Sequence, residues 1–164
     1  MRVYKRYVKY FPKPLEESLE IHASIAELYK ENNENKKHLQ TLRYIIKADA
    51  KAGKARTERT RYLAGMASLS IIAPIYDQFV AIKLNRPFKR NLAKKKKKLK
   101  SNIRKYNKLV DYHVGDVTAA ATFYIAETYY HFSRALLDSE RPKKLNELEL
   151  EQYNLIIEDQ AYPF

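Results

Sequence analysis

The lysine-rich stretch NLAKKKKKLKSNIRK, residues 91–105, holds the side chains best suited to binding chemistry in this sequence. Between Arg86 and Asp111, twelve cations and one anion give a local charge of +11, within a chain that carries +13. The excess of positive charge is therefore one local feature. Such a patch attracts nucleic-acid phosphate, anionic lipid or an acidic protein without choosing among them. The candidate contacts are Lys94, Lys95, Lys96, Lys97, Lys98, Lys100, Arg104 and Lys105.

The sequence contains few of the residue patterns that catalysis or metal binding requires. The sequence has no cysteine, its three glycines are isolated, and no Gly-x-Ser-x-Gly or Ser-x-x-Lys motif is present. The four histidines lie on separate predicted helices, without the His-x-x-x-His or Glu-x-x-His spacing that would place two ligands on one helix face. They are His22, His38, His113 and His131. We predict a protein with no catalytic residues, no metal site and no cofactor.

The elements that position these side chains are predicted to be helices. Three glycines in 164 residues leave little material for β-hairpins, and the composition favours an all-α fold. Apolar residues at helical spacing predict antiparallel helical hairpins. The expected helices run over residues 14–31, 36–52, 57–84, 88–112, 118–137 and from 147 onward. Pro74 lies inside the third, where it predicts a kink or a break.

The helix that carries the lysines also shows an apolar seam with coiled-coil spacing. Its members are Phe88, Leu92, Leu99, Ile103, Tyr106, Val110 and His113, with a gap at Lys95 and Lys96. We expect this helix to pair antiparallel with the third across the NRP turn, with Leu99, Ile103 and Tyr106 against Leu69, Ile72 and Tyr76. Successive residues are about 100° apart, so five consecutive lysines point in every direction around the helix. One or two should lie beside the seam and extend outward along their stems, and the run as a whole is expected to form a solvated ridge.

A short repeat links the two ends of the chain. SIAELYKEN at 24–32 and YIAETYYHF at 124–132 share Ile-Ala-Glu-x-Tyr. Small alanines let a neighbouring helix approach, and tyrosines fill the angle between the helices of a pair. We predict these structural roles for Ile25, Ala26 and Tyr29, and again for Ile125, Ala126 and Tyr129. Tyr4, Tyr7 and Tyr10 near the N-terminus are candidates for lining a binding groove.

The segment YVKYFPKPLEESLEIHASIAELYKENNENKKHLQTLRYIIKAD resembles a degenerate tetratricopeptide repeat behind a Tyr-x-x-x-Phe-Pro spacer. His38, Asn35 and Ala50 depart from the family pattern, and the loop DSERPKKLNELE in the later copy is too long. The resemblance implies a single helical domain with three sub-regions: a repeat hairpin over 1–53, an inserted long basic hairpin over 54–113, and a second repeat hairpin over 114–164, truncated at its C-terminus.

The same resemblance implies a non-enzymatic scaffold for protein–protein interaction in the cell envelope of Gram-negative bacteria, in the periplasm or at the outer membrane. The chain would then be a segment of a larger protein, with any signal peptide upstream of Met1. No apolar run approaches the length of a membrane span. The alternative function is polyanion binding, to nucleic acid or anionic lipid, through the lysine-rich helix 86–108. Specific nucleic-acid recognition is disfavoured because no helix-turn-helix or RNA-binding signature accompanies the lysines.

Overall fold

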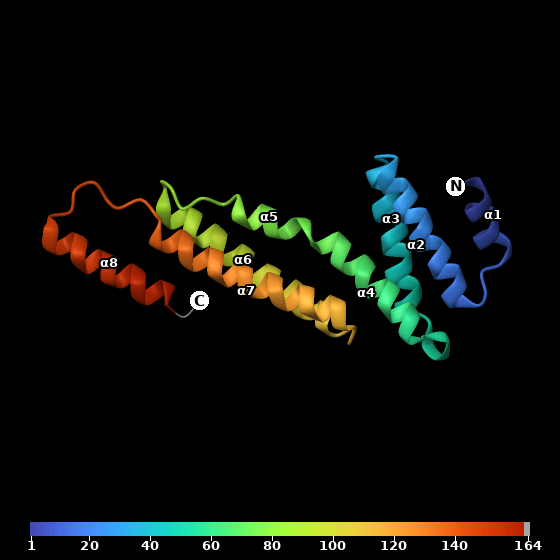
Figure 1. Ribbon diagram of the computed structural model, residues 1–164. Helices are drawn as coiled ribbons and strands as arrows, with labels where there is room; N and C mark the ends of the chain where they lie inside the picture. Colours follow the sequence, from blue (N-terminus) through green and yellow to red (C-terminus); the bar gives the residue numbers. More distant parts are fainter. Residues whose placement is uncertain (163–164) are drawn as a thin grey trace. The chain divides into compact units, whose positions relative to one another are not determined.

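The computed structural model describes residues 1–162 and is helical throughout, with no strand in that range. This confirms the all-α prediction. The helices are α1 (Arg2–Tyr10), α2 (Leu15–Glu31), α3 (Asn35–Ala50), α4 (Glu58–Ile72), α5 (Pro74–Val80), α6 (Phe88–Val110), α7 (Gly115–Leu137) and α8 (Glu147–Ala161), with a short 3-10 turn, η1 (Gly53–Ala55) (Figure 1).

The chain forms two compact units, and the single domain with three sub-regions that the family resemblance implies stays a prediction. Unit 1 contains Met1–Ala73 and Lys108–Ala121, and unit 2 contains Pro74–Asn107 together with the chain from Thr122 onward. The first boundary falls at Pro74, where α4 ends and α5 begins. Proline lacks the N–H that a continuous helix needs, so the predicted break is confirmed and it coincides with a change of unit.

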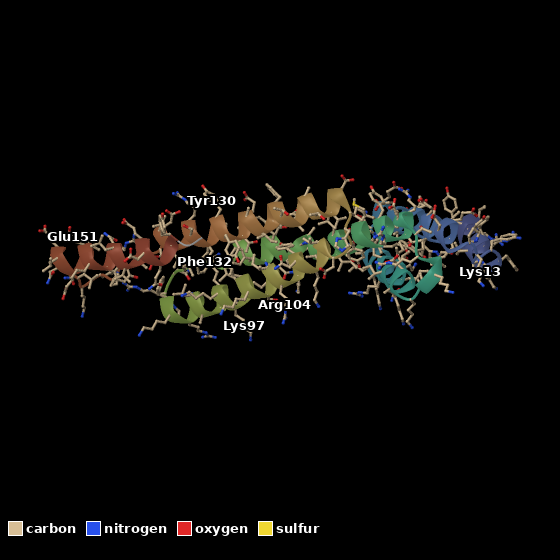
Figure 2. All side chains as sticks on the ribbon, turned by 90° about the horizontal axis from the view of Figure 1, so that it is seen from below. Lys13, Lys97, Arg104, Tyr130, Phe132 and Glu151 are labelled. Carbon is tan, nitrogen blue, oxygen red and sulfur yellow. The ribbon has the colours of Figure 1, made fainter. Side chains whose placement is uncertain are left out.

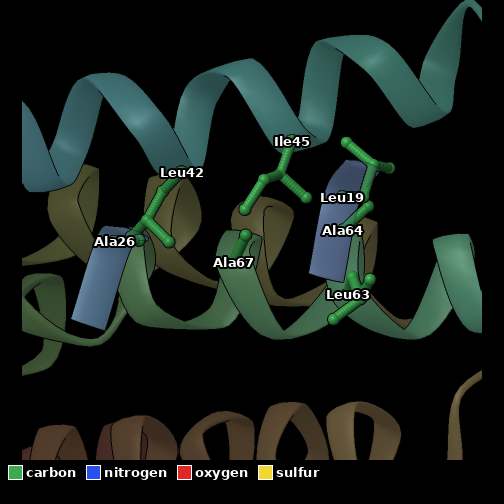
Figure 3. Close-up of a cluster of buried hydrophobic side chains, with 7 residues drawn as sticks. All are labelled: Leu19, Ala26, Leu42, Ile45, Leu63, Ala64 and Ala67. Carbon is green, nitrogen blue, oxygen red and sulfur yellow. The ribbon is translucent and has the colours of Figure 1, made fainter. Parts of the chain in front are cut away.

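The core of unit 1 lies between α2, α3 and α4. The helices α2 and α3 form an antiparallel hairpin, and α4 packs against both (Figure 1). The turn between α2 and α3 passes through Asn33, whose φ of 58° is in the left-handed region. Asparagine tolerates this conformation well. Figure 3 shows the buried cluster, in which alanines from α2 and α4 let the helices approach closely. Its members are Leu19, Ala26, Leu42, Ile45, Leu63, Ala64 and Ala67.

Unit 1 also buries one carboxylate. Asp49 on α3 is 1% exposed and forms an ion pair with Arg56, with Oδ2 2.9 Å from Nη2. The Thr60 hydroxyl donates to Asp49 Oδ1 over 2.8 Å. Thr60 is also part of the capping box that begins α4, where its backbone N–H donates to the Thr57 hydroxyl. One carboxylate thus connects the end of α3 to the start of α4.

The core of unit 2 is built from α5, α6, α7 and α8. The pair α5 and α6 is antiparallel, as predicted, and side chains of α6 bond to α5 close to the predicted register. Asn102 Nδ2 donates to the Ile75 carbonyl over 3.1 Å, and Lys98 Nζ donates to Gln78 Oε1 over 2.9 Å. The buried cluster comprises Phe79, Leu84, Leu99, Phe132, Leu136, Ile157 and Ala161.

The buried seam of α6 is more regular than the sequence suggested. Its fully buried positions, at alternating steps of four and three, are Lys95, Leu99, Asn102, Tyr106 and Leu109. A lysine and an asparagine therefore occupy seam positions, and the predicted gap is filled by Lys95. The assignment of His113 to the seam is wrong. Since α6 ends at Val110, His113 lies in the following turn with a φ of 52° and is exposed.

The last two helices begin at or near their predicted starts. α7 begins at Gly115, three residues before the predicted start at residue 118, and α8 begins at Glu147, as predicted. α8 begins with a capping box in which the Asn146 side chain accepts from the Glu149 N–H over 2.9 Å. Arg141 fixes the loop between them by donating to the Leu137 carbonyl over 2.9 Å and to Asn154 Oδ1 over 2.6 Å.

Candidate functional site

The first candidate surface is the basic face of α6, which we define as Lys94, Lys96, Lys97, Lys98, Lys100, Arg104 and Lys105. These side chains are exposed or half-buried, and Figure 2 shows Lys97 and Arg104 pointing away from α7 into solvent. α6 contains no acidic residue. Within residues 1–162, none of the ion pairs involves a cation of this face. The surface therefore presents positive charge that the protein itself leaves unneutralised.

Lys95 does not belong to this surface, and its predicted place on a solvated ridge is wrong. It is completely buried, and its Nζ donates to the carbonyls of Phe79 over 3.1 Å and Ile82 over 2.7 Å. The same nitrogen lies 4.4 Å from the centre of the Phe79 ring. The last carbonyls of a helix have no intrahelical partner and carry partial negative charge, so a lysine can cap them. Lys95 thus closes the C-terminal end of α5.

Burying the charged Lys95 ammonium costs desolvation free energy, and its two hydrogen bonds to carbonyl groups offset only part of it. Burial, and then the nearby charge of Lys83, lower the pKa of Lys95 from its ordinary value of 10.5 to about 8. The sequence did contain a signal for this role. The apolar seam lacks a member between Leu92 and Leu99, so position 95 or 96 had to face inward.

The second candidate surface is a groove in unit 1, between α2 and α4, with a cavity volume of about 680 Å³. Leu42 and Ile45 of α3 lie at its floor. Small residues on the two flanking helices keep it open, namely Ala23, Ser24, Ala67 and Ser70. We call this the α2–α4 groove. The sequence did not predict it, because it depends on how three helices pack.

The rim of the α2–α4 groove is polar and carries both signs of charge. Arg59 pairs with Glu20 across the two helices, and the Lys30 ammonium lies 3.7 Å from Glu27. Tyr4 of α1 contributes to the lining, whereas Tyr7 and Tyr10, which were predicted together with it, are not among the residues that line this groove. An apolar floor with hydrogen-bonding groups at the rim suits a peptide segment, whose side chains and backbone need both kinds of contact.

The two copies of the repeated motif behave differently. Ile25, Ala26 and Tyr29 are all buried, and the Ala26 carbonyl accepts a hydrogen bond from the His38 ring over 2.8 Å. The second copy does not reproduce this arrangement: Ala126 is exposed, whereas Ile125 and Tyr129 are half-buried. α7 buries the face that holds Ala121, Thr128, Phe132 and Leu136. Ala126 points away from that face, so its predicted role in close helix packing is wrong.

The histidines occupy separate environments. His22 bonds to the Ser18 carbonyl over 2.7 Å and stacks on Tyr44, whereas His38 is buried against Ala26. His131 packs edge-on against Phe79, and burial, followed by the charges of Lys95 and Lys83, lowers its pKa. In the part of the chain that the structure describes, no three His, Asp or Glu side chains come together as metal ligands.

No protein-family model, curated protein or solved structure matches this chain. The resemblance to tetratricopeptide repeats therefore stays a prediction. One helical stretch in the described residues, Glu58–Val80, which comprises α4 and α5, is long and apolar enough to cross a membrane by length and composition, and its most apolar 18-residue window has a mean hydropathy of 1.3. Core helices of water-soluble proteins pass the same test, so the predicted absence of a membrane span also stays a prediction.

Proposed function

We propose that this chain is a non-enzymatic scaffold for protein–protein interaction, built from tetratricopeptide-like helical hairpins, and that the α2–α4 groove binds a segment of a partner protein. The supporting observation is the groove itself. It is an open depression of about 680 Å³ in unit 1, with an apolar floor and a rim of ionised side chains. A location in the periplasm or at the outer membrane is part of this proposal and comes from the family resemblance alone.

The packing of unit 1 supports this use of the groove. α2 contacts both α3 and α4. The helices α2 and α4 therefore flank a shared channel that lies over α3. The channel is held open by small residues on rigid helices and is not made by a loop. A pre-formed site on rigid elements loses little conformational entropy when a ligand binds. Met66 lines the groove and is 37% exposed, and its flexible thioether can adapt to different partner side chains.

The test is to block the groove without disturbing the core. Peptides selected from a random library on the wild-type chain are titrated against Ser24→Trp, which places a large ring in the channel from an exposed position. Ala93→Trp on α6 is the matched control, since it is also exposed and lies outside the groove. We expect Ser24→Trp to weaken binding at least about tenfold, a loss of about 1.4 kcal/mol. Equal binding to the two variants would show that the peptides bind elsewhere.

A second candidate function is polyanion binding through the basic face of α6. Its supporting observation is the row of cations that have no acidic partner in the described residues. Phosphate contacts of this kind release counterions, so binding to duplex DNA, heparin or anionic vesicles should weaken steeply with added salt. Replacing Lys96, Lys97 and Lys100 with glutamine should reduce both the affinity and its dependence on salt. If affinity is unchanged in this variant, the basic face is not the binding surface.

A further inference from the structure

The last helix, α8, has a surface that the rest of the chain leaves uncovered. It buries Ile157 and Ala161 in unit 2, whereas Leu148 is 65% exposed, Leu155 56% and Ile156 54%. Leu148 and Leu155 are seven residues apart, so they lie on one side of the helix, and Ile156 is beside them. An apolar stripe on one face is the usual mark of a helix that packs against another helix.

This apolar stripe of α8 is surrounded by negative charge. α8 carries five carboxylates and no cation: Glu147, Glu149, Glu151, Glu158 and Asp159. Among residues 1–162, the ion pairs include none of these carboxylates. Glu151 projects outward from the helix (Figure 2). A partner for this surface must therefore supply positive charge together with exposed apolar side chains.

The first helix, α1, has the complementary character. It carries four cations, Arg2, Lys5, Arg6 and Lys9, and no acidic residue. It also exposes apolar and aromatic side chains, with Val3 76% exposed and Tyr10 65%. Val3, Tyr7 and Tyr10 follow i, i+4, i+7 spacing, so they form a stripe along one side of α1. No residue of α1 is fully buried within its own unit.

We propose that α1 of one copy of this chain packs on α8 of a second copy, so that the protein associates head to tail. The two helices match in both respects that such packing requires, namely an apolar stripe and opposite charge. The basic face of α6 is the poorer match for α8. It has ample charge, but the apolar residues of α6, such as Phe88, Leu92 and Leu99, pack within unit 2.

This pairing joins two different surfaces, so each copy keeps one free α1 and one free α8. Such a heterologous contact produces rings or open chains and not a closed two-fold dimer. α1 has nine residues, so the contact is small and the association is weak. Much of the attraction is electrostatic between exposed groups, so added salt should dissociate the assembly.

The experiment measures the mass of the full chain by analytical ultracentrifugation over a wide concentration range at low salt. The wild type is compared with Arg2→Glu/Arg6→Glu/Lys9→Glu, which changes the side-chain charge of α1 from +4 to −2, and with Glu147→Lys/Glu151→Lys/Glu158→Lys/Asp159→Lys, which changes that of α8 from −5 to +3. Lys96→Glu/Lys97→Glu, on the basic face of α6, is the matched control. Circular dichroism verifies that every variant keeps its helix content.

We expect the wild type and the α6 control to associate as concentration rises, and each of the other two variants to associate at least about tenfold more weakly, because like charges would then face each other. Mixing the α1 variant with the α8 variant should restore assembly, since the reversed α1 then meets the reversed α8. A wild type that stays monomeric at all concentrations would overturn the proposal. So would association that the α6 variant abolishes, or that survives both other reversals.

Discussion

Each of the two units buries an ionised side chain, and they stabilise it in different ways. In unit 1, Asp49 is paired with the opposite charge of Arg56 and accepts from the Thr60 hydroxyl. In unit 2, Lys95 has no acidic partner in the described residues and donates instead to the carbonyls of Phe79 and Ile82. Asp49 is therefore balanced by a full charge, whereas Lys95 is balanced only by peptide dipoles.

Peptide dipoles carry only partial charges, so they balance a buried charge less completely than an opposite charge does. Partial charges at the end of a helix amount to about half an elementary charge. Desolvation accordingly remains the main influence on Lys95 and lowers its pKa to about 8. The stability of unit 2 should thus depend on pH in the mildly alkaline range. The following predictions test this difference, from the largest expected effect to the smallest.

Lys95→Glu should have the largest effect. It places a carboxylate against two carbonyl oxygens in a site with no exposed surface. A buried charge without a donor costs about 3–5 kcal/mol of unfolding free energy, a large part of the stability of a small protein. Urea denaturation measures the loss. The control is Lys97→Glu, on the exposed side of the same helix, which should change stability by less than about 0.5 kcal/mol. Equal effects would contradict the buried position of Lys95.

The pH dependence of stability should reveal the charge of Lys95 directly. The folded protein releases this proton near pH 8, whereas the unfolded chain holds it up to about pH 10.5. Between these values the unfolded state binds more protons, so the unfolding free energy rises with pH. The rise attributable to Lys95 is at most about 3.4 kcal/mol, from a shift of about 2.5 pH units at 1.36 kcal/mol each.

Lys95→Met removes this titration while keeping a chain of similar length. The difference in unfolding free energy between the wild type and Lys95→Met should therefore rise between pH 8 and pH 10.5. Burial also raises the pKa of Tyr106, to about 12, so Tyr106 contributes to the pH dependence of stability as well. This contribution is the same in both proteins, and it cancels when the two free energies are subtracted. A difference that is flat with pH would show that the folded protein holds the Lys95 proton as tightly as the unfolded chain does, so that burial does not lower the pKa of Lys95.

Asp49→Asn should destabilise unit 1 by about 2 kcal/mol, because the hydrogen bonds that Asp49 accepts are made to a charged group. The amide keeps the shape of the side chain but loses the ion pair with Arg56. Arg56→Gln should cost less, since the Arg56 side chain is 41% exposed and water can replace its contacts. Thermal unfolding of the two variants tests this order, and a larger loss for Arg56→Gln would reverse our assignment of the buried partner.

The smallest effect is expected on the basic face of α6. Replacing Lys94, Lys96, Lys97 and Lys98 with glutamine, while keeping Lys95, should change the unfolding free energy by no more than about 0.5 kcal/mol. Like charges at i,i+4 repel, so a slight gain is expected. Adding Lys95→Gln to this variant should then lower stability clearly, because glutamine is too short to replace the ammonium. If the fifth substitution has no effect, the five lysines are equivalent.

The sequence predicted most helices to within a few residues, because amphipathic periodicity and the breakers at Pro14, Asn32, Pro74 and Pro87 are local signals. It also predicted the antiparallel pairing of α5 with α6, since only the short segment 81–87, which contains the NRP turn, separates them. It did not predict α1. In RVYKRYVKY, Val3, Tyr7 and Tyr10 do follow helical spacing, but nine residues are fewer than a periodicity argument needs.

The candidate sites were predicted less well, since each depends on contacts between segments far apart in the chain. The exposed lysines follow from composition and helical geometry. The α2–α4 groove does not, because residues from α1, α2, α3 and α4 line it. The shared motif Ile-Ala-Glu-x-Tyr also led to a wrong prediction for its second copy. Ala26 and Ala126 have the same local sequence, but Ala26 is buried and Ala126 is exposed.

What the sequence determined by itself is the all-α fold, the break at Pro74 and the concentration of positive charge on α6, because each follows from local backbone preference or from composition. What only the tertiary structure decided is the environment of each side chain. Five identical lysines have the same intrinsic chemistry, and Lys95 alone is fully buried because its direction on α6 faces the end of α5. Burial is a property of the packed helices, so the protonation and stability that depend on it arise only once α5 and α6 come together.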